Sequence, residues 1–464
     1  MFAAPKMIWL SVSRSCILAA MGYLRLHDGD TVAVLGGGPA GSFFATHLQH
    51  LSRKHGIGLK VVIIERKSFA THGPVGCNMC AGVLGGNIVN MISGLDIALD
   101  SRVIRQNVEG FRINLNGIGS LIERPGAKVY TVFRGIGPRP ESSSEGFMGF
   151  DSFLLEEAKK AGVVVLIATV TDIVLPQNPA RDLCIVRYRN EGNVPGEMRA
   201  ALIVGAFGVN SALSAKFGFG YRGPGYWHTC QAELMADTES EITRYISVFS
   251  RSRSKFLFTA ITPKGRYVTV SGIGRHVRFS ELIEELKVLR LDPVIRTGLT
   301  SVCHCHPRLP VTAAVRPFHT RVVMVGDACV SRYMKNGIES AFITSRYAAE
   351  TALLLGIDEA AFRDAYYPGY AAQFVSDNRY GRALFFLHRV NASSRRLSSA
   401  IIFAIDGERG LTRDRQWMSG IVWHMFIGDR PYRLILKDLL FVTGIMGLLL
   451  RIIGIKKRPK GYQI

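Results

Sequence analysis

Glycines at Gly36–Gly41, in the sequence GGGPAG, constrain the fold of this chain more than any other feature. The apolar run before them, Thr31–Leu35, is typical of a buried parallel strand. A helical pattern follows from Pro39 to about residue 55, and a second apolar run lies at Lys60–Ile64. This order predicts a strand, a helix and a parallel strand that open an α/β domain.

The spacing of these glycines fits the pattern G-x-G-x-x-G, in which each glycine has a physical reason. Gly36 permits a tight turn, Gly38 lets a pyrophosphate approach the backbone, and Gly41 allows the helix to pack closely on the strand. Pro39 and Ala40 begin the helix, where unpaired amides and the helix dipole favour negative charge. We therefore expect these five residues to bind a dinucleotide; the alternative is a glycine-rich turn without a ligand.

A carboxylate and nearby arginines extend this candidate site. Glu65 ends the second apolar run, twenty-four residues after Gly41, where it would accept hydrogen bonds from a ribose diol. A glutamate there favours FAD or NAD over a 2′-phosphorylated cofactor. Arg66 follows it directly and belongs to the same candidate site. Arg134 and Arg139, in the segment VFRGIGPR, either contact phosphate or adenosine or are exposed loop cations.

The pair Gly326-Asp327 distinguishes FAD from NAD. It follows a buried-strand pattern at Arg321–Val325 and leads into a helix, so Asp327 is placed to hold a ribityl hydroxyl. Gly337 and Ile338 lie at the expected start of that helix. Their amides would face the pyrimidine edge of an isoalloxazine and stabilise negative charge there. The alternative role of Asp327 is that of a helix N-cap.

The remaining pattern predicts a nucleotide domain that is interrupted and then resumed. Buried-strand patterns occur at Val163–Ala168 and Ala201–Val204, and Phe150–Lys160 has a helical pattern. Between Tyr221 and Arg278, β-branched residues alternate as in an antiparallel sheet. We expect a Rossmann-type FAD-binding domain of the α/β class, an antiparallel β-sheet substrate lobe and a helical C-terminal extension. The expected segments are 1–28 (amphipathic N-terminus), 29–110, 141–217 and 313–356 (FAD-binding domain), 111–140 and 218–312 (substrate lobe), and 357–464 (membrane-associated extension).

The sequence contains, in this order, the motifs GGGPAG, IIER, FD..LL..A, VGA.G, and VGDA with NGI..A. The order of these motifs resembles the flavoprotein family of geranylgeranyl reductases and aromatic-ring hydroxylases. The likeness covers about Thr31 to Leu355, and Gly76–Gly82 resembles the cysteine-bearing C-A-G segment of the reductase branch. The resemblance implies a hydroxylase-type fold, FAD held without a covalent link, and a β-sheet lobe over the isoalloxazine. It also implies an isoprenoid substrate, because the reductase branch saturates isoprenoid double bonds in lipids.

Two departures from this family pattern concern the electron donor and the surroundings of the flavin. Phe207 occupies the acidic position of the hydroxylase branch, which argues against binding of a dissociable NAD(P)H. A ferredoxin-like protein donor and a quinone acceptor stay open. The usual proline-rich turn after Asp327 is replaced by SRYMKN at 331–336, which places a cation near the flavin. The Trp-x-Trp-x-Ile-Pro motif of the halogenase branch does not occur in the sequence.

Cys77 and Cys80 form a C-x-x-C pair in an expected loop beside the flavin. The pair indicates a redox couple, or a single thiol that relays a proton or tunes the ring; inert structural cysteines are the alternative. A metal site completed by Cys303–His306 is disfavoured, since C-x-C-x-H departs from the usual ligand spacing, and we expect no metal. Tyr333 and Lys335 are further catalytic candidates behind these thiols.

The composition indicates an anionic partner. The 57 Lys and Arg exceed the 36 Asp and Glu by 21, and the mean hydropathy is positive at +0.17. Aromatic residues are not interleaved with the basic ones as in nucleic-acid-binding motifs, so we expect an anionic lipid surface and no nucleic acid. Eight cysteines in 464 residues favour a reducing compartment over a disulfide framework.

Both ends of the chain carry apolar segments. Met1–Met21 lacks the clean apolar run of a signal peptide, so we expect an amphipathic helix, with initiation at Met21 as the alternative. Leu439–Ile455 contains Arg451, and as a helix of about 26 Å it falls short of a hydrocarbon core of ~30 Å. We expect it to lie in one leaflet, at the cytoplasmic face of the cell membrane, with packing on the protein's own core as the alternative.

Together these features predict an FAD-dependent oxidoreductase that transfers hydride between flavin and an apolar, isoprenoid- or lipid-like substrate at a membrane surface. One alternative is an FAD-dependent monooxygenase that uses NAD(P)H and O₂. A second is an electron-transfer flavoprotein subunit that reduces membrane quinone.

Overall fold

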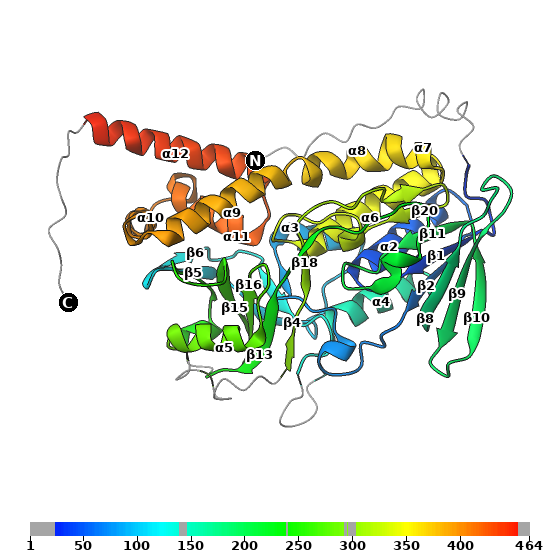
Figure 1. The fold of residues 1–464 in the computed structure, drawn as a ribbon, viewed down its shortest axis with the longest axis horizontal. Helices are drawn as coiled ribbons and strands as arrows, with labels where there is room; N and C mark the ends of the chain where they lie inside the picture. The colour runs from blue at the N-terminus through cyan, green and yellow to red at the C-terminus, as the bar shows by residue number, and fades with distance from the viewer. Residues whose placement is uncertain (1–23, 139–145, 238–239, 292–294, 296–302, 453–464) are drawn as a thin grey trace.

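The computed structural model describes residues 24–138, 146–237, 240–291, 295 and 303–452 (Figure 1). The expected N-terminal amphipathic segment therefore lies almost wholly outside the described residues. Arg139 and the last three residues of the expected leaflet-embedded helix also lie outside them.

An eight-stranded sheet forms the larger lobe, with the strand order β10-β9-β8-β2-β1-β11-β20-β19 (Figure 1). Its five central strands are mutually parallel. They are β8 (Val164–Val174), β2 (Lys60–Glu65), β1 (Thr31–Leu35), β11 (Leu202–Gly205) and β20 (Val322–Met324). Four of them, all but β8, are almost continuous runs of buried residues, as expected for strands covered on both faces. That composition is why the sequence pattern predicted their positions.

The edges of this sheet are antiparallel. A hairpin of β9 (Cys184–Asn190) and β10 (Pro195–Ala200) extends one side, and β19 (Phe318–His319) the other. The sequence pattern did not predict the hairpin, because half-exposed strands such as Pro195–Ala200 have no apolar run. The β9–β10 hairpin is separated from β1 by β8 and β2, whereas β19 pairs directly with β20.

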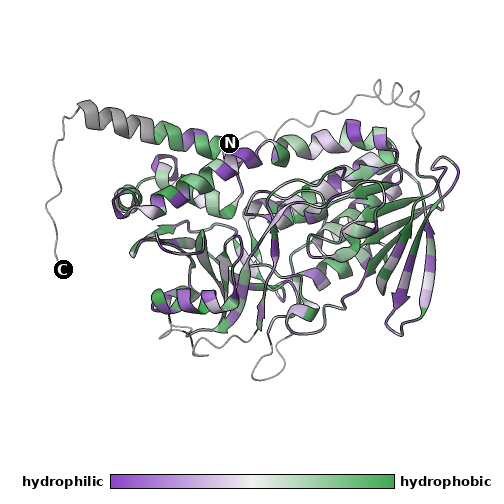
Figure 2. Cartoon of the chain, viewed as in Figure 1, coloured by the Kyte–Doolittle hydropathy of each residue, from purple (hydrophilic) through white to green (hydrophobic). Residues whose placement is uncertain are grey.

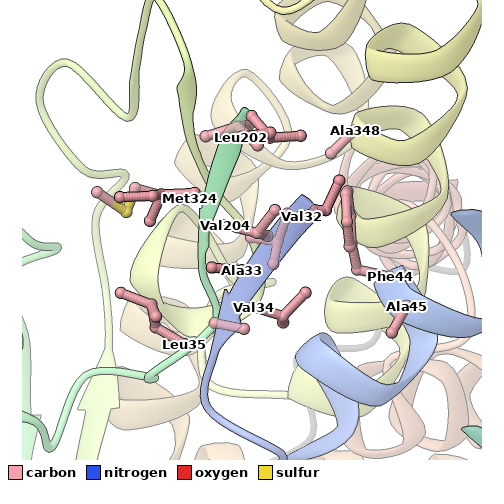
Figure 3. Packing of buried hydrophobic residues seen from close by; sticks show 14 of the residues in the cluster. Val32, Ala33, Val34, Leu35, Phe44, Ala45, Leu202, Val204, Met324 and Ala348 are labelled. Atoms are coloured by element: carbon pink, nitrogen blue, oxygen red, sulfur yellow. The ribbon is translucent and has the colours of Figure 1, made fainter. Parts of the chain in front are cut away.

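Three helices pack on the larger sheet: α2 (Pro39–Lys54), α4 (Phe150–Lys160) and α6 (Gly337–Leu354). Figure 3 shows Phe44 of α2 and Ala348 of α6 beside Val32 of β1. Burial of each such aliphatic or aromatic side chain contributes about 1.5–3 kcal/mol. This packing holds α2 and α6 against each other, so their N-termini lie at the same edge of the sheet.

A seven-stranded sheet forms the second lobe, in the order β17-β13-β16-β15-β14-β5-β6. Its neighbours are antiparallel except for the parallel pair β14–β5, and α5 (Phe279–Val288) packs on one face. The strands are β5 (Gly110–Leu115), β6 (Ile118–Glu123), β13 (Cys230–Met235), β14 (Ile246–Ser250), β15 (Phe258–Lys264), β16 (Tyr267–Ile273) and β17 (Cys303–Cys305). Short elements connect the lobes: β3 (Val83–Leu84), α3 (Gly86–Ser93), β4 (Ile104–Asn107), β7 (Tyr130–Val132), β12 (Tyr226–His228) and β18 (Arg308–Pro310).

The described part of the chain ends in helices, as predicted for the C-terminal extension. They are α7 (Glu359–Ala361), α8 (Tyr367–Tyr370), α9 (Asn378–Ser393), α10 (Arg395–Gly407), α11 (Trp417–Ile427) and α12 (Tyr432–Ile452). Within the described part of the chain, every helix is too short or too polar to cross a lipid bilayer. The last four helices lie over the β5–β6 end of the second lobe (Figure 1).

A buried carboxylate joins this extension to the body of the protein. The Asp377 side chain is 2% exposed and accepts hydrogen bonds from the Tyr432 and Arg433 amides, at 2.7 and 3.0 Å, so it caps the start of α12. Its Oδ2 also pairs with Arg332 at 3.3 Å. The neighbouring Asn378 accepts from the Tyr333 amide at 2.8 Å. The turn at 331–336 is therefore fixed by the C-terminal helices.

Candidate functional site

The two glycine-containing turns singled out in the sequence line one cavity of about 680 Å³. Such a volume is typical of small-molecule and cofactor sites. Gly36 and Gly38 lie in its wall together with Asp327 and Gly337, although the two pairs are far apart in the sequence. The cavity extends from the ends of β1 and β2 to the inner face of the second sheet. The turns therefore face a common space, as a single extended ligand would require.

The glycine turn after β1 has the close contacts that the sequence pattern predicted. Gly36 has a φ of +114°, and a Cβ there would lie 2.6 Å from the Ala206 carbonyl oxygen. A Cβ on Gly41 would lie 1.9 Å from the Gly36 carbonyl oxygen. Gly38 is the N-cap residue of α2, and Pro39 and Ala40 line the cavity beside it. Unpaired amides of a helix N-terminus thus point toward a space that can hold an anion.

Glu65 lies at the end of β2 and lines the same part of the cavity. Its Oε2 accepts from the Gly37 amide at 2.6 Å, and its Oε1 accepts from the Lys67 amide at 2.8 Å. Burial raises the pKa of this carboxyl, although both amide bonds act in the opposite direction. Glu65 therefore fixes the glycine turn to β2. Arg66 is exposed at the edge of the cavity.

The Arg134 side chain is only 10% exposed, so the interpretation of this residue as an exposed loop cation was wrong. Its guanidinium forms a bidentate pair with Asp151, which is fully buried in the first turn of α4, with NH2 2.9 Å from Oδ2. Asn78 donates to the same carboxylate at 2.6 Å. The pair lies beside the glycine turn, since a Cβ on Gly38 would be 3.7 Å from the Arg134 guanidinium. Sequence reasoning missed Asp151, whose only local signal is an acid at the start of a helix.

Asp327 is a half-buried residue whose Oδ1 atom is buried and has no hydrogen-bond partner among the described residues. Burial raises its pKa, against the effects of Ser331 and Arg134. The N-cap residue of α6 is Asn336, so the interpretation of Asp327 as the helix N-cap was wrong. Gly337 and Ile338 form the first turn of α6 and line the cavity. A buried, unpaired acceptor at this position suits a hydroxyl-bearing ligand.

The two cysteines of the C-x-x-C pair have different surroundings. Cys80 lines both the main cavity and a smaller neighbouring one, whereas Cys77 lines the smaller one and not the main cavity, together with Cys303 and Cys305. Burial raises the pKa of the Cys77 thiol and raises that of Cys303 to about 11. All four are free thiols. Among the described residues, no cluster of three or more His, Cys, Asp or Glu side chains is arranged to hold a metal ion.

The two remaining catalytic candidates, Tyr333 and Lys335, also differ in their position relative to the main cavity. Tyr333 does not line the cavity; it packs on Phe385 of α9, with ring centroids 6.0 Å apart. Lys335 does line the cavity, and its Nζ lies 4.7 Å from the ring centroid of Phe258 and 5.2 Å from that of Phe426. Burial lowers the pKa of Lys335 to about 8. Sequence reasoning had no signal for these aromatic neighbours, which come from β15 and α11.

The chain has the fold of the FAD-dependent hydroxylase and reductase flavoproteins. This fold combines a parallel sheet that has a glycine turn at β1, a second antiparallel sheet over its carboxyl edge, and a later aspartate that faces the same cavity. This confirms the predicted fold class. No protein-family model matches the sequence, and no curated protein matches it either.

Solved structures with this fold include three that span most of the chain. A geranylgeranyl bacteriochlorophyll reductase-like protein from Thermoplasma acidophilum matches with a TM-score of 0.63 at 17% identity, over 89% of this chain and 96% of that one. p-Nitrophenol 4-monooxygenase from Pseudomonas putida matches with a TM-score of 0.56 at 16% identity, over 87% of this chain and 100% of that one. A myxobacterial chondrochloren halogenase matches with a TM-score of 0.54 at 17% identity, over 87% of this chain and 99% of that one.

Proposed function

We propose that the chain binds FAD in the main cavity and acts as an FAD-dependent oxidoreductase. The observation that carries this proposal is the unpaired buried oxygen of Asp327, which shares a cavity with the glycine turn at Gly36–Gly41. A buried carboxyl oxygen without a hydrogen-bond partner is unfavourable unless a ligand supplies that partner. The solved structures with this fold are named as reductases, monooxygenases and halogenases, which supports the same class of cofactor.

Each part of FAD has a fitting partner in the cavity. The N-terminus of α2 at Gly38 would hold the pyrophosphate, and Glu65 would face the adenosine ribose. Asp327 would accept a hydrogen bond from the ribityl chain, and the first amides of α6, at Gly337 and Ile338, would face the pyrimidine ring. The bound flavin supplies hydride chemistry, and the chain supplies orientation and electrostatics.

The substrate end of the cavity supports an apolar substrate. Its wall is formed by side chains of the second sheet and of α11. They include Phe111, Ile246, Val248, Phe258, Ile273 and Phe426. We infer a reaction in which hydride moves between flavin and an isoprenoid- or lipid-like molecule, in line with the reductase-like protein of the same fold. Cys80 and Lys335 are the candidate groups at this end.

A monooxygenase reaction is the second candidate, because p-nitrophenol 4-monooxygenase shares the fold. Phe207 argues against the NAD(P)H that this reaction needs. Its ring stacks on Phe217, with centroids 5.8 Å apart, and offers no carboxylate to a nicotinamide cofactor. A ferredoxin-like donor or a quinone partner would avoid that requirement, and quinone reduction without an organic substrate is the third candidate.

We also propose that the C-terminal helices dock on the cytoplasmic face of a membrane with anionic lipids. Large apolar side chains are exposed there: Phe386 (66%), Phe403 (80%), Leu440 (60%) and Phe441 (57%). Figure 2 shows hydrophobic and hydrophilic residues side by side along this part of the chain. Exposed apolar groups flanked by cations are typical of helices that lie in a bilayer interface.

A glycine substitution tests the cofactor site. Gly38→Glu would bring a negative charge to the proposed pyrophosphate position, so the purified variant should be colourless while the parent is yellow. Gly146→Glu is the matched control, because Gly146 is exposed and a Cβ there meets nothing within 4 Å. Visible flavin absorbance retained in Gly38→Glu, or missing from the parent protein after FAD is added, would contradict the proposal.

The acceptor class can then be identified with the holoprotein. Anaerobically photoreduced protein would be mixed separately with membrane lipid extract and with a soluble quinone, and reoxidation would be followed by absorbance. We expect the lipid extract to reoxidise the flavin. Reoxidation by quinone alone would support the electron-transfer alternative instead.

A further inference from the structure

Lys335 differs from the other charged residues of the main cavity by its surroundings. The carboxylates that line the described cavity are Glu65 and Asp327, and both lie at the end formed by the two turns. Lys335 instead faces the apolar wall, with its Nζ over the rings of Phe258 and Phe426 at 4.7 and 5.2 Å. No carboxylate of the described residues forms an ion pair with it. It is a cation whose exposed surface faces the cavity.

The neighbouring polar groups do not balance this charge. His388 of α9 is a titratable group that interacts electrostatically with Lys335. Burial lowers the pKa of His388 to about 4, and the charge of Lys335 lowers it further. Its Nε2 bonds to Ser250 Oγ at 2.8 Å, so the imidazole is neutral and engaged elsewhere. An ammonium group that is partly removed from water without an anion is unfavourable, and contacts with aromatic rings recover only a part of that loss.

A packed structure holds the ammonium in this position. The Lys335 turn is fixed through Arg332 and Asp377, and a Cβ on Gly428, at the end of α11, would lie 2.9 Å from the Cβ of Lys335. The backbone and Cβ of Lys335 are therefore held in place beside the cavity. The charge and the apolar wall are presented to any ligand together.

We infer that Lys335 binds the carboxylate of an otherwise apolar substrate, whose body packs against the wall formed by Phe111, Val248 and Ile273. This inference rests on the proposed function in that the substrate shares the cavity with FAD. It narrows the substrate class from apolar molecules in general to apolar acids. A carboxylate next to Lys335 would supply the anion that the protein itself does not.

Three probes of equal chain length test this inference: decanoate, decanol and decyltrimethylammonium. Each would be titrated into the FAD-loaded protein, with calorimetry and the flavin absorbance difference as readouts. A charge-assisted contact predicts that decanoate binds at least about tenfold tighter than decanol, and that the cation binds weakest. In Lys335→Met, decanoate and decanol should bind within about twofold of each other. Lys128→Met, an exposed lysine replaced by the same residue, should keep the preference of the parent protein.

The outcomes are separable from a failure of the proposed function. Equal affinities for decanoate and decanol in the parent protein would overturn the inference whether or not Lys335→Met folds. A variant that shifts the flavin reduction potential but keeps the preference for decanoate would also overturn it, since Lys335 would then act on the cofactor. If the protein does not take up FAD, the proposed function fails, while calorimetry on the cofactor-free protein still tests the anion site.

Discussion

The two ends of the main cavity are built in different ways. At the cofactor end, Gly38, Glu65 and Asp327 each lie in a short motif at or just after the end of a parallel strand, and the backbone amides of Gly37 and Lys67 donate to Glu65. At the substrate end, Lys335 obtains its surroundings from β15 and α11, which are distant in the sequence. The first end depends on local chain geometry, and the second depends on how remote segments pack. Substitutions should therefore affect the two ends separately.

The largest expected effect comes from the joint behind the substrate end. Asp377→Ala removes the cap of α12 and leaves Arg332 buried without its partner. Loss of one member of a buried pair costs about 3–5 kcal/mol. We expect the free energy of unfolding, measured by urea denaturation, to fall by that amount. In this variant the preference for decanoate should be lost more readily than the binding of FAD. Asp172→Ala, which breaks an exposed pair with Arg187, should change stability by less than about 1 kcal/mol.

A second substitution addresses the cofactor end alone. Asp327→Ala removes the acceptor proposed for the ribityl chain, so FAD affinity should fall by about ten- to a hundredfold. The cofactor-free variant should be at least as stable as the parent protein, because an unpaired buried oxygen is removed. Equilibrium dialysis with FAD measures the first effect, and Asp327→Asn, which keeps an acceptor, is the control. Unchanged FAD affinity in Asp327→Ala would show that this turn does not hold the cofactor.

A third prediction uses the charge at the substrate end. Without ligand, Lys335→Met should raise the free energy of unfolding by about 1–3 kcal/mol at neutral pH, because methionine needs no anion. The pKa of Lys335 is lowered to about 8 in the folded state, so the unfolded chain binds more protons between pH 8 and the ordinary value of 10.5. The advantage of methionine should therefore be full below pH 8 and disappear toward pH 10.5. An advantage independent of pH in urea denaturation would contradict the assignment.

The smallest effects are expected at the thiols. Because burial raises the pKa of Cys77, its alkylation by iodoacetamide at neutral pH should be slower than in unfolded protein by about tenfold or more. Cys77→Ser should change the free energy of unfolding by about 1 kcal/mol or less. Mass spectrometry of labelled peptides measures the first value. Rapid labelling of Cys77 in the folded protein would return it to the candidates for a redox role.

The difference between the two ends also explains what the sequence could predict. The central strands β1, β2, β11 and β20, the glycine turn and Asp327 follow from apolar runs and from residues within a few positions of them. Asp151 and Asp377 have no such signal, because each acts on a partner from another segment. Tyr333 and Lys335 are two positions apart in one turn, yet packing directs only Lys335 into the cavity. Side-chain direction in an irregular turn is decided by the whole fold.

The carboxylate shared between Arg332 and the first amides of α12 has a practical meaning for anyone who trims this chain. Shortening the chain from its C-terminal side would remove a support of the substrate end of the main cavity before any group proposed to bind the cofactor phosphates was lost. A version cut after α6 would go further and also remove Phe362, Tyr366 and Phe374, which are buried in the core of the larger lobe, so the cofactor end would lose its support as well.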